Sequence, residues 1–154
     1  MARIEKLLLE ESGILALFDC DKFKSINDTY GHLVGDKVLI EVANKLQKVF
    51  SDQVLFRLGG DEFVVYLTET YLKQKSAEGM TECEIFEWLQ QELSTICIPE
   101  MFGQWPTLSG GAARSDKENP VIFDELYKHA DVALYQSKKF GRKKVTLLKS
   151  INMD

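Results

Sequence analysis

The sequence predicts one α+β domain with a ferredoxin-like βααββαβ core, in which helices flank a central antiparallel sheet. A continuous apolar run at residues 14–18 indicates a central strand that is covered on both faces. Two further apolar runs joined through Gly59-Gly60 indicate a β-hairpin, because its turn needs a positive φ angle that glycine adopts without strain. Amphipathic segments at helical spacing separate these strands.

The composition limits the class of protein. The chain has 154 residues, the size of one ordinary domain, and its three cysteines lack the CxxC spacing of a zinc site. Its 24 acidic and 19 basic side chains leave a formal charge of −5 at pH 7, which argues against a nucleic-acid partner. No apolar run approaches the roughly 20 residues of a membrane span, and no signal peptide is visible. We therefore expect a cytoplasmic domain without membrane contact.

The first half of the chain is assigned by periodicity. Residues 2–11 are expected to form a short amphipathic helix before the strand at 14–18. A polar stretch follows over residues 22–35, and a long helix begins near Asp36 because apolar residues then recur at helical spacing. The complete order, α-β-α-α-β-β-α-β-α-β, counts two helices between the first strand and the hairpin.

The second half alternates strands with longer helices, whose ends coincide with proline or glycine. Pro99 ends one helix, and Gly141 follows another as its C′ residue. The expected elements are strands at 54–58, 63–67, 107–113 and 144–148, helices at 82–98 and 122–140, and a polar loop at 69–80.

Carboxylates cluster where two neighbouring strands end. The first strand runs into Asp19 and Asp21, and the hairpin turn carries Asp61 and Glu62. Side chains brought together in this way repel one another unless a divalent cation lies between them, and hard oxygen ligands favour Mg²⁺. Two such ions could promote a phosphoryl displacement. The alternative is that Asp19 and Asp21 cap a helix while Asp61 and Glu62 are solvated turn residues.

Basic residues gather near the C-terminus, five of them within residues 138–144. They either complement the dipole of the helix that they end or bind a triphosphate. Lys24, taken alone, would be a solvated surface residue. Cys20 lies between two acids that should raise the pKa of its thiol, so it is expected to be a poor nucleophile.

Four motifs in a fixed order identify a family. Residues 59–63 read GGDEF, residues 19–28 resemble DxDxFKxxND, and residues 31–36 match GHxxGD. Residues 130–142 are similar to ADxALYxAK followed by GR. Over about residues 13–148 the chain closely resembles the GGDEF domains of bacterial diguanylate cyclases. The resemblance implies a palm-type nucleotidyltransferase of signal transduction, which condenses two GTP into cyclic di-GMP and releases pyrophosphate.

The resemblance also implies which residues form the catalytic and metal site. Asp19 and Asp61 would bind Mg²⁺ (or Mn²⁺) through their carboxylates, and Cys20 through its backbone carbonyl. Glu62 would assist metal binding or deprotonate the attacking 3′-hydroxyl. Phosphoryl transfer depends mainly on positioning and charge stabilisation, so a short set of residues can suffice.

Substrate contacts are implied in the same way. Asn27 and Asp36 would read the guanine edge, and aspartate at position 36 favours GTP over ATP because some relatives that make a mixed purine dinucleotide have serine there. Cations would bind the phosphates, and two glycines would let the nucleotide approach the backbone. These residues are Lys24, Lys138, Arg142, Gly59 and Gly60.

Two segments depart from the family pattern. The product-inhibition motif RxxD is replaced by Phe50-Ser51-Asp52-Gln53, so no product-inhibition site and no tight binding of cyclic di-GMP are expected there. The DxLTGLxNR segment that usually opens the domain is lacking, since the chain starts where only its tail could remain. We therefore expect residues 1–154 to be a single GGDEF domain, either a fragment of a larger protein with a linked sensor or receiver domain or an unusually short form.

The leading hypothesis is an active cyclase that works as a transient homodimer, because each domain holds one GTP. Two alternatives stay open: a catalytically silent GGDEF domain that serves as a GTP-binding or protein-interaction module, and another metal-dependent nucleotidyltransferase. The intact residues 59–63 favour the active enzyme over the silent module. The input signal, and whether the parent protein is anchored in a membrane, are left open.

Overall fold

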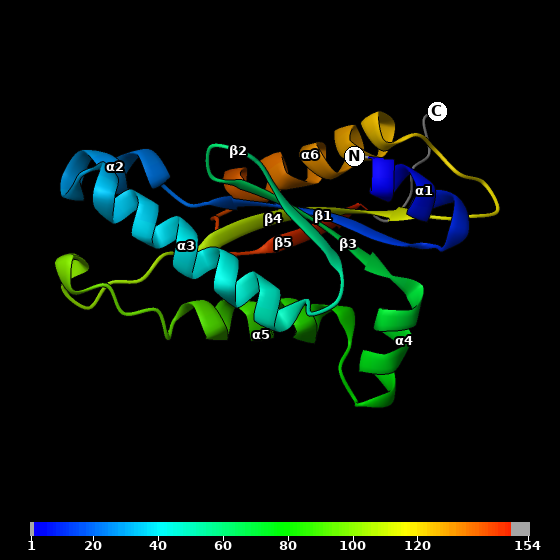
Figure 1. Cartoon of the computed structure of the whole chain (residues 1–154), viewed down its shortest axis with the longest axis horizontal. Coiled ribbons are helices and arrows are strands. Elements are labelled where there is room, and N and C mark those ends of the chain that lie inside the picture. The colour runs from blue at the N-terminus through cyan, green and yellow to red at the C-terminus, as the bar shows by residue number, and fades with distance from the viewer. Residues whose placement is uncertain (1, 149–154) are drawn as a thin grey trace.

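A computed structural model describes residues 2–148 (Figure 1). One five-stranded sheet with the order β2-β3-β1-β4-β5 forms its middle layer. Neighbouring strands pair antiparallel except β4 and β5, which are parallel, so the sheet is mixed rather than wholly antiparallel. The α+β ferredoxin-like prediction is confirmed, and each strand boundary lies within two residues of the expected one. The strands are β1 (Gly13–Cys20), β2 (Val54–Gly59), β3 (Glu62–Thr68), β4 (Leu108–Ser115) and β5 (Val145–Leu148).

Helices cover both faces of the sheet (Figure 1). Side chains alternate along a strand, so Phe18 of β1 packs with the helices of one face and Leu17 with those of the other. Both are fully buried, which confirms β1 as the central strand. Within residues 2–148 no helix combines the length and the apolarity needed to cross a membrane. The covering helices are α3 (His32–Val49) and α5 (Glu82–Leu93) on one face, and α1 (Ala2–Glu10) and α6 (Phe123–Lys139) on the other.

The polar stretch at 22–35 is helical, which corrects the expected start of a helix near Asp36. It contains α2 (Phe23–Tyr30) and the first turn of α3, which begins at His32. Ile26 of α2 is buried, and Phe23 and Tyr30 pack partly buried against the same core, so α2 has a short apolar stripe whose polar neighbours hid it from the sequence prediction. The two helices counted between the first strand and the hairpin are present.

The expected loop at 69–80 is also wrong, because it contains α4 (Glu69–Ala77). Thr68 caps this helix by accepting a hydrogen bond from the backbone N–H of Tyr71 at 3.2 Å. Tyr71 is buried, and its hydroxyl donates to the Val49 carbonyl at 2.8 Å. The buried Tyr71, the partly buried Leu72 and the Thr68 cap therefore hold a helix whose sequence is otherwise mostly polar.

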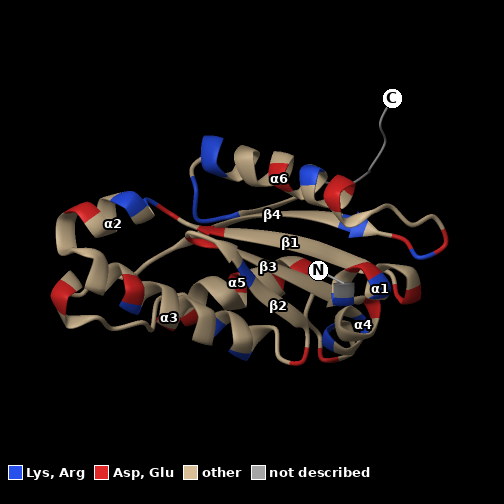
Figure 2. Ribbon diagram, turned by 45° about the horizontal axis from the view of Figure 1, so that its top comes forward, with Lys and Arg blue, Asp and Glu red and all other residues tan. Residues whose placement is uncertain are grey.

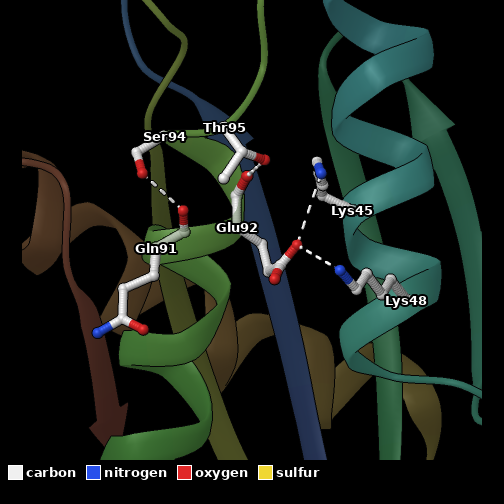
Figure 3. A network of polar contacts seen from close by, with 6 residues as sticks. All are labelled: Lys45, Lys48, Gln91, Glu92, Ser94 and Thr95. Atoms are coloured by element: carbon white, nitrogen blue, oxygen red, sulfur yellow. Dashed lines mark hydrogen bonds and ion pairs between the residues drawn. The ribbon is translucent and has the colours of Figure 1, made fainter.

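Helix α5 ends at Leu93 rather than at residue 98. Just beyond it, the Ser94 hydroxyl donates to the Gln91 carbonyl and the Thr95 hydroxyl donates to the Glu92 carbonyl, both at 2.6 Å (Figure 3). These side chains satisfy carbonyls that a continuing helix would bond. The chain then runs through a 3₁₀ turn, Pro99–Met101, into β4.

Helices α3 and α5 are also joined by charge. Glu92 of α5 forms ion pairs with Lys48 at 2.9 Å and with Lys45 at 3.5 Å, both on α3 (Figure 3).

On the opposite face, Gly111 lets α6 approach β4 closely, because a Cβ there would lie 2.1 Å from the backbone nitrogen of Leu134. This close packing fixes the register of α6 over the sheet. The register in turn decides which side chains of α6 reach the ends of the strands.

Candidate functional site

The carboxylates predicted from the sequence meet at one end of the sheet. Asp19 on β1 is the register partner of Glu62 on β3, and Asp61 lies in the turn directly before it. The turn is closed by Gly60, whose φ is 53°, and by Arg57, whose Nε donates to the Gly60 carbonyl at 2.7 Å. In Figure 2 this acidic strand end lies beside the basic end of α6 and the basic loop that follows it.

The Asp19 carboxylate is crowded and only partly satisfied. Its side chain is 15% exposed, and its Oδ2 contacts the Lys138 ammonium group of α6. Its Oδ1 is buried without a hydrogen-bond partner among the described residues. Burial and the adjacent Asp19 raise the pKa of Asp61 to about 7, although a backbone hydrogen bond and the charge of Lys138 act in the opposite direction. Two crowded carboxylates and an unpartnered oxygen fit a divalent cation.

Cys20 lies between these acids at the end of β1. Burial, and then the charges of Asp61, Asp21 and Asp19, raise the pKa of its thiol to about 12, so the expectation of a poor nucleophile is supported. Within residues 2–148 no three His, Cys, Asp or Glu side chains are arranged to hold a metal together. A cation here would need further ligands from backbone, water or phosphate, as Mg²⁺ commonly takes them.

A residue that the sequence analysis missed also reaches this site. The hydroxyl of Tyr127, on α6, donates to Glu62 Oε1 at 2.5 Å. Tyr127 lies about three turns of 3.6 residues before Lys138, so both side chains share one face of α6. That spacing was the one sequence signal that could have found it. Tyr127 thereby fixes the orientation of the Glu62 carboxylate.

The two residues expected to read guanine both adjoin Gly35, Asn27 through its side chain and Asp36 as the next residue of α3. A Cβ at Gly35 would lie 1.9 Å from Asn27 Oδ1, so only glycine leaves room for the amide. Asp36 follows Gly35 on α3 and is exposed. It lines a cleft of about 830 Å³ between α3 and the hairpin, together with Arg57 and Phe63.

The expected phosphate-binding cations are less closely grouped. Lys138 contacts Asp19, whereas Lys24 is exposed on α2. Arg142 is exposed in the loop after α6 and lines a second cleft of about 430 Å³ together with Lys22. Gly59 and Gly60 are exposed in the hairpin turn, open to close approach.

Neither aspartate of the first motif caps a helix. The residue before α2 is Lys22, which makes no side-chain capping bond, so the capping alternative is wrong. The Asp21 carboxylate instead accepts hydrogen bonds from Thr107 and Ser109 at the start of β4. Asp21 thus joins the ends of two neighbouring strands.

The positions that would carry the product-inhibition motif have other partners. Phe50 is buried in the core between the sheet and α3. Gln53 Oε1 accepts hydrogen bonds from the Thr68 N–H at 3.0 Å and from the Thr68 hydroxyl at 3.2 Å. Weak or absent binding of cyclic di-GMP at these positions stays a prediction, which calorimetric titration of nucleotide-free protein would measure.

Comparison with known proteins places this geometry in a family. The sequence matches the family described as "Diguanylate cyclase, GGDEF domain" over residues 3–144. Diguanylate cyclase DgcM of Escherichia coli (strain K12) is 34% identical over 144 residues, which cover 93% of this chain and 32% of DgcM. The probable diguanylate cyclase DgcT of the same strain is 37% identical over 137 residues, covering 88% of this chain and 29% of DgcT. The chain therefore spans about three-tenths of the length of these relatives.

Solved structures show the same relationship. The coiled coil and GGDEF domain of DgcB from Caulobacter crescentus, solved with c-di-GMP, aligns with a TM-score of 0.80 at 25% identity, over 96% of this chain and 78% of that one. The active GGEEF domain of a diguanylate cyclase from Vibrio cholerae aligns with a TM-score of 0.76 at 28% identity, over 97% and 89%. The family predicted from the four motifs is confirmed: the chain belongs to the GGDEF-domain diguanylate cyclases, a family of enzymes.

Proposed function

We propose that this chain condenses two molecules of GTP into cyclic di-GMP with release of pyrophosphate. The observation that carries the proposal is the meeting of Asp19 with Asp61 and Glu62 at one strand end, where Asp19 Oδ1 has no partner among the described residues. Membership of the diguanylate cyclase family supports the same reaction.

In each of two equivalent steps, the 3′-oxygen of one GTP would bond to the α-phosphorus of the other. The bond from that phosphorus to the bridging oxygen breaks, and pyrophosphate leaves. Glu62, oriented by Tyr127, would assist removal of the 3′-hydroxyl proton. Asp19, Asp61 and the carbonyl of Cys20 would hold a divalent cation, with Mg²⁺ the expected one. Such a cation supplies charge stabilisation at the phosphates.

The remaining residues would orient the nucleotide. Asn27 and Asp36 present an amide and a carboxylate that complement the donors and acceptors of guanine. Lys24, Lys138 and Arg142 would neutralise the triphosphate through charge-assisted hydrogen bonds. Because one domain carries one such set, the two substrates must come from two domains, and the active form would be a transient homodimer. A linked sensor or receiver domain in the parent protein would regulate that pairing.

A second candidate function is a silent GTP-binding or protein-interaction module. The contact between Lys138 and Asp19 favours it, since a lysine already neutralises the carboxylate that would bind the cation. The intact signature from Gly59 to Phe63 favours the active enzyme instead.

Turnover by an enforced dimer tests the proposal. The chain would be fused to a dimerising coiled coil and incubated with GTP and Mg²⁺, and the products identified by mass. Cyclic di-GMP is expected, at a higher rate than from the unfused chain at the same concentration. Bound GTP without any product from the fused dimer would contradict the proposal and support the silent module.

A further inference from the structure

Two consecutive residues in the loop after α6 have an unusual backbone conformation. Arg142 has a φ of 61° and Lys143 a φ of 48°, both in the left-handed region that non-glycine residues rarely adopt. Such conformations persist where surrounding contacts hold them, and they concentrate at functional sites. The contacts that hold this loop therefore bear on the placement of Arg142.

The two ends of the loop are fixed by backbone hydrogen bonds. The N–H of Arg142 donates to the Ser137 carbonyl at 2.9 Å, which joins the loop to the last turn of α6. The carbonyl of Lys144 accepts from the Gly110 N–H at 2.8 Å, which joins it to β4. Neither bond involves Lys143, in the middle of the loop.

The middle of the loop is held by Asp21. Its Oδ2 accepts the backbone N–H of Lys143 at 3.1 Å and the Thr107 hydroxyl at 2.6 Å. Its Oδ1 accepts the Ser109 hydroxyl at 2.6 Å, and its own N–H donates to the Thr107 carbonyl at 2.9 Å. Ser109 is fully buried, so the carboxylate is anchored on the β4 side and directed toward the loop.

This set of partners explains why the residue is an acid. Three donors converge on one side chain, and an ionised carboxylate offers only acceptors. An asparagine of the same size would keep only one neutral acceptor oxygen, and a hydroxyl of Thr107 or Ser109 would have to turn and accept from its NH₂ group. The charged acceptor also makes the bond to the Lys143 N–H stronger than a neutral one.

We propose that Asp21 is a positioning residue that clamps the loop 141–143, and hence Arg142, against the strand end that carries Asp19. One cleft of about 430 Å³ is lined by Asp21, Lys22, Arg142 and Lys143. Asp21 and the Arg142 side chain that it positions therefore lie on the same side of the site. The inference rests on the proposed function, in which Arg142 binds a phosphate of GTP. In this role Asp21 acts through the loop and not by contact with the substrate.

Limited proteolysis tests the clamp without relying on activity. Trypsin cleaves after Arg142, Lys143 and Lys144, so cleavage in this loop, mapped by mass, reports how firmly the loop is held. We expect Asp21→Asn to be cut there roughly tenfold faster than the wild type, because the charge-assisted hydrogen bond to the Lys143 N–H becomes at best a neutral one. Asp124→Asn is the matched control, since Asp124 is exposed in the first turn of α6, and its cleavage should equal that of the wild type. Equal cleavage of Asp21→Asn and the wild type would overturn the proposal.

Steady-state kinetics on the same variants test the effect on substrate. A displaced phosphate-binding cation should raise KM for GTP about tenfold and leave kcat within about threefold of the wild type. A variant that is only less stable would lower the amount of active enzyme without raising KM. Unchanged KM would overturn the positioning role. If the wild type itself has no turnover, the proposed function fails, and cleavage alone decides whether the clamp exists.

Amide hydrogen exchange of the wild type covers the case in which Asp21→Asn does not fold. The Lys143 amide should exchange at least tenfold more slowly than in an unstructured peptide, because it donates to a carboxylate. Exchange at the unstructured rate would overturn the clamp.

Discussion

Replacing Gly35 with alanine should impair guanine recognition without unfolding the domain. The new Cβ would lie 1.9 Å from Asn27 Oδ1 and 3.0 Å from Asn27 Cγ, so the amide must leave its position. The next atom, Phe23 Cζ, is 3.3 Å away and needs only a small shift. Alanine is favoured over glycine inside a helix by about 0.8–1 kcal/mol, which offsets the cost of moving one side chain. The free energy of unfolding should therefore stay within about 1 kcal/mol of the wild type.

The kinetic effect follows from the hydrogen bonds proposed for Asn27. An amide that reads a guanine edge makes one or two hydrogen bonds, each worth about 0.5–1.5 kcal/mol. Loss of two bonds corresponds to about 1–3 kcal/mol, or roughly a 5-fold to 150-fold rise in KM for GTP. The kcat value should change much less, because Asp61 and Glu62 are not displaced.

The assay is a double-mutant cycle with initial rates measured against GTP concentration. Gly35→Ala, Asn27→Ala and the double variant should all raise KM to a similar extent, because each removes the same amide from the same place. Asn44→Ala, at an exposed asparagine of α3, is the matched control and should behave as the wild type. Independent, additive effects of the two substitutions would refute this reasoning, as would a wild-type KM for Gly35→Ala.

Three further predictions concern single side chains. Tyr127→Phe removes the hydrogen bond to Glu62, so kcat should fall about tenfold with KM nearly unchanged; initial rates measure this, and an unaltered kcat would contradict it. Asp36→Ser should lower the preference for GTP over ATP at least about tenfold when the two nucleotides compete in one turnover assay. Retention of the full preference would show that Asp36 does not recognise guanine. Glu92→Gln should cost about 0.5–1 kcal/mol at pH 7 and low salt, because the hydrogen bond from Lys48 lowers the pKa of Glu92 in the folded state. Because the pKa of Glu92 is lower in the folded state, its charge stabilises the fold above the pKa of the unfolded state, and this contribution disappears as the pH falls through the folded-state pKa. The Tm values of the wild type and Glu92→Gln should therefore converge in acid. A Tm difference independent of pH would contradict this.

The strand framework was predictable because its signals are local. The apolar run of β1 and the Gly-Gly turn between β2 and β3 each lie within a few residues, and together they place Asp19 beside Glu62. The direction of the raised pKa of Cys20 could also be predicted from the adjacent Asp19 and Asp21, although burial and Asp61 contribute more than either of them. Helix α4 was missed because its sequence is mostly polar, and the bounds of α2 were missed because only Phe23, Ile26 and Tyr30 mark its inward face.

The contacts that orient the site were not predictable, because they join distant parts of the chain. Tyr127 and Glu62 are 65 positions apart, and Asp21 and Lys143 are 122 apart. Only the packing of α6 on β4, which Gly111 permits, brings these partners together. A pattern that extends over a few residues holds no information about such pairs.

The most direct test of the central claim compares the wild type with Asp61→Asn. Both proteins, as coiled-coil-fused dimers at equal concentration, would be incubated with GTP and Mg²⁺, and cyclic di-GMP quantified by mass. The amide keeps the size of the side chain but removes the charge that would bind the cation, so product should fall at least about a hundredfold while the Tm is retained. Equal amounts of cyclic di-GMP from the two proteins would contradict the assignment of the strand-end carboxylates as the catalytic centre.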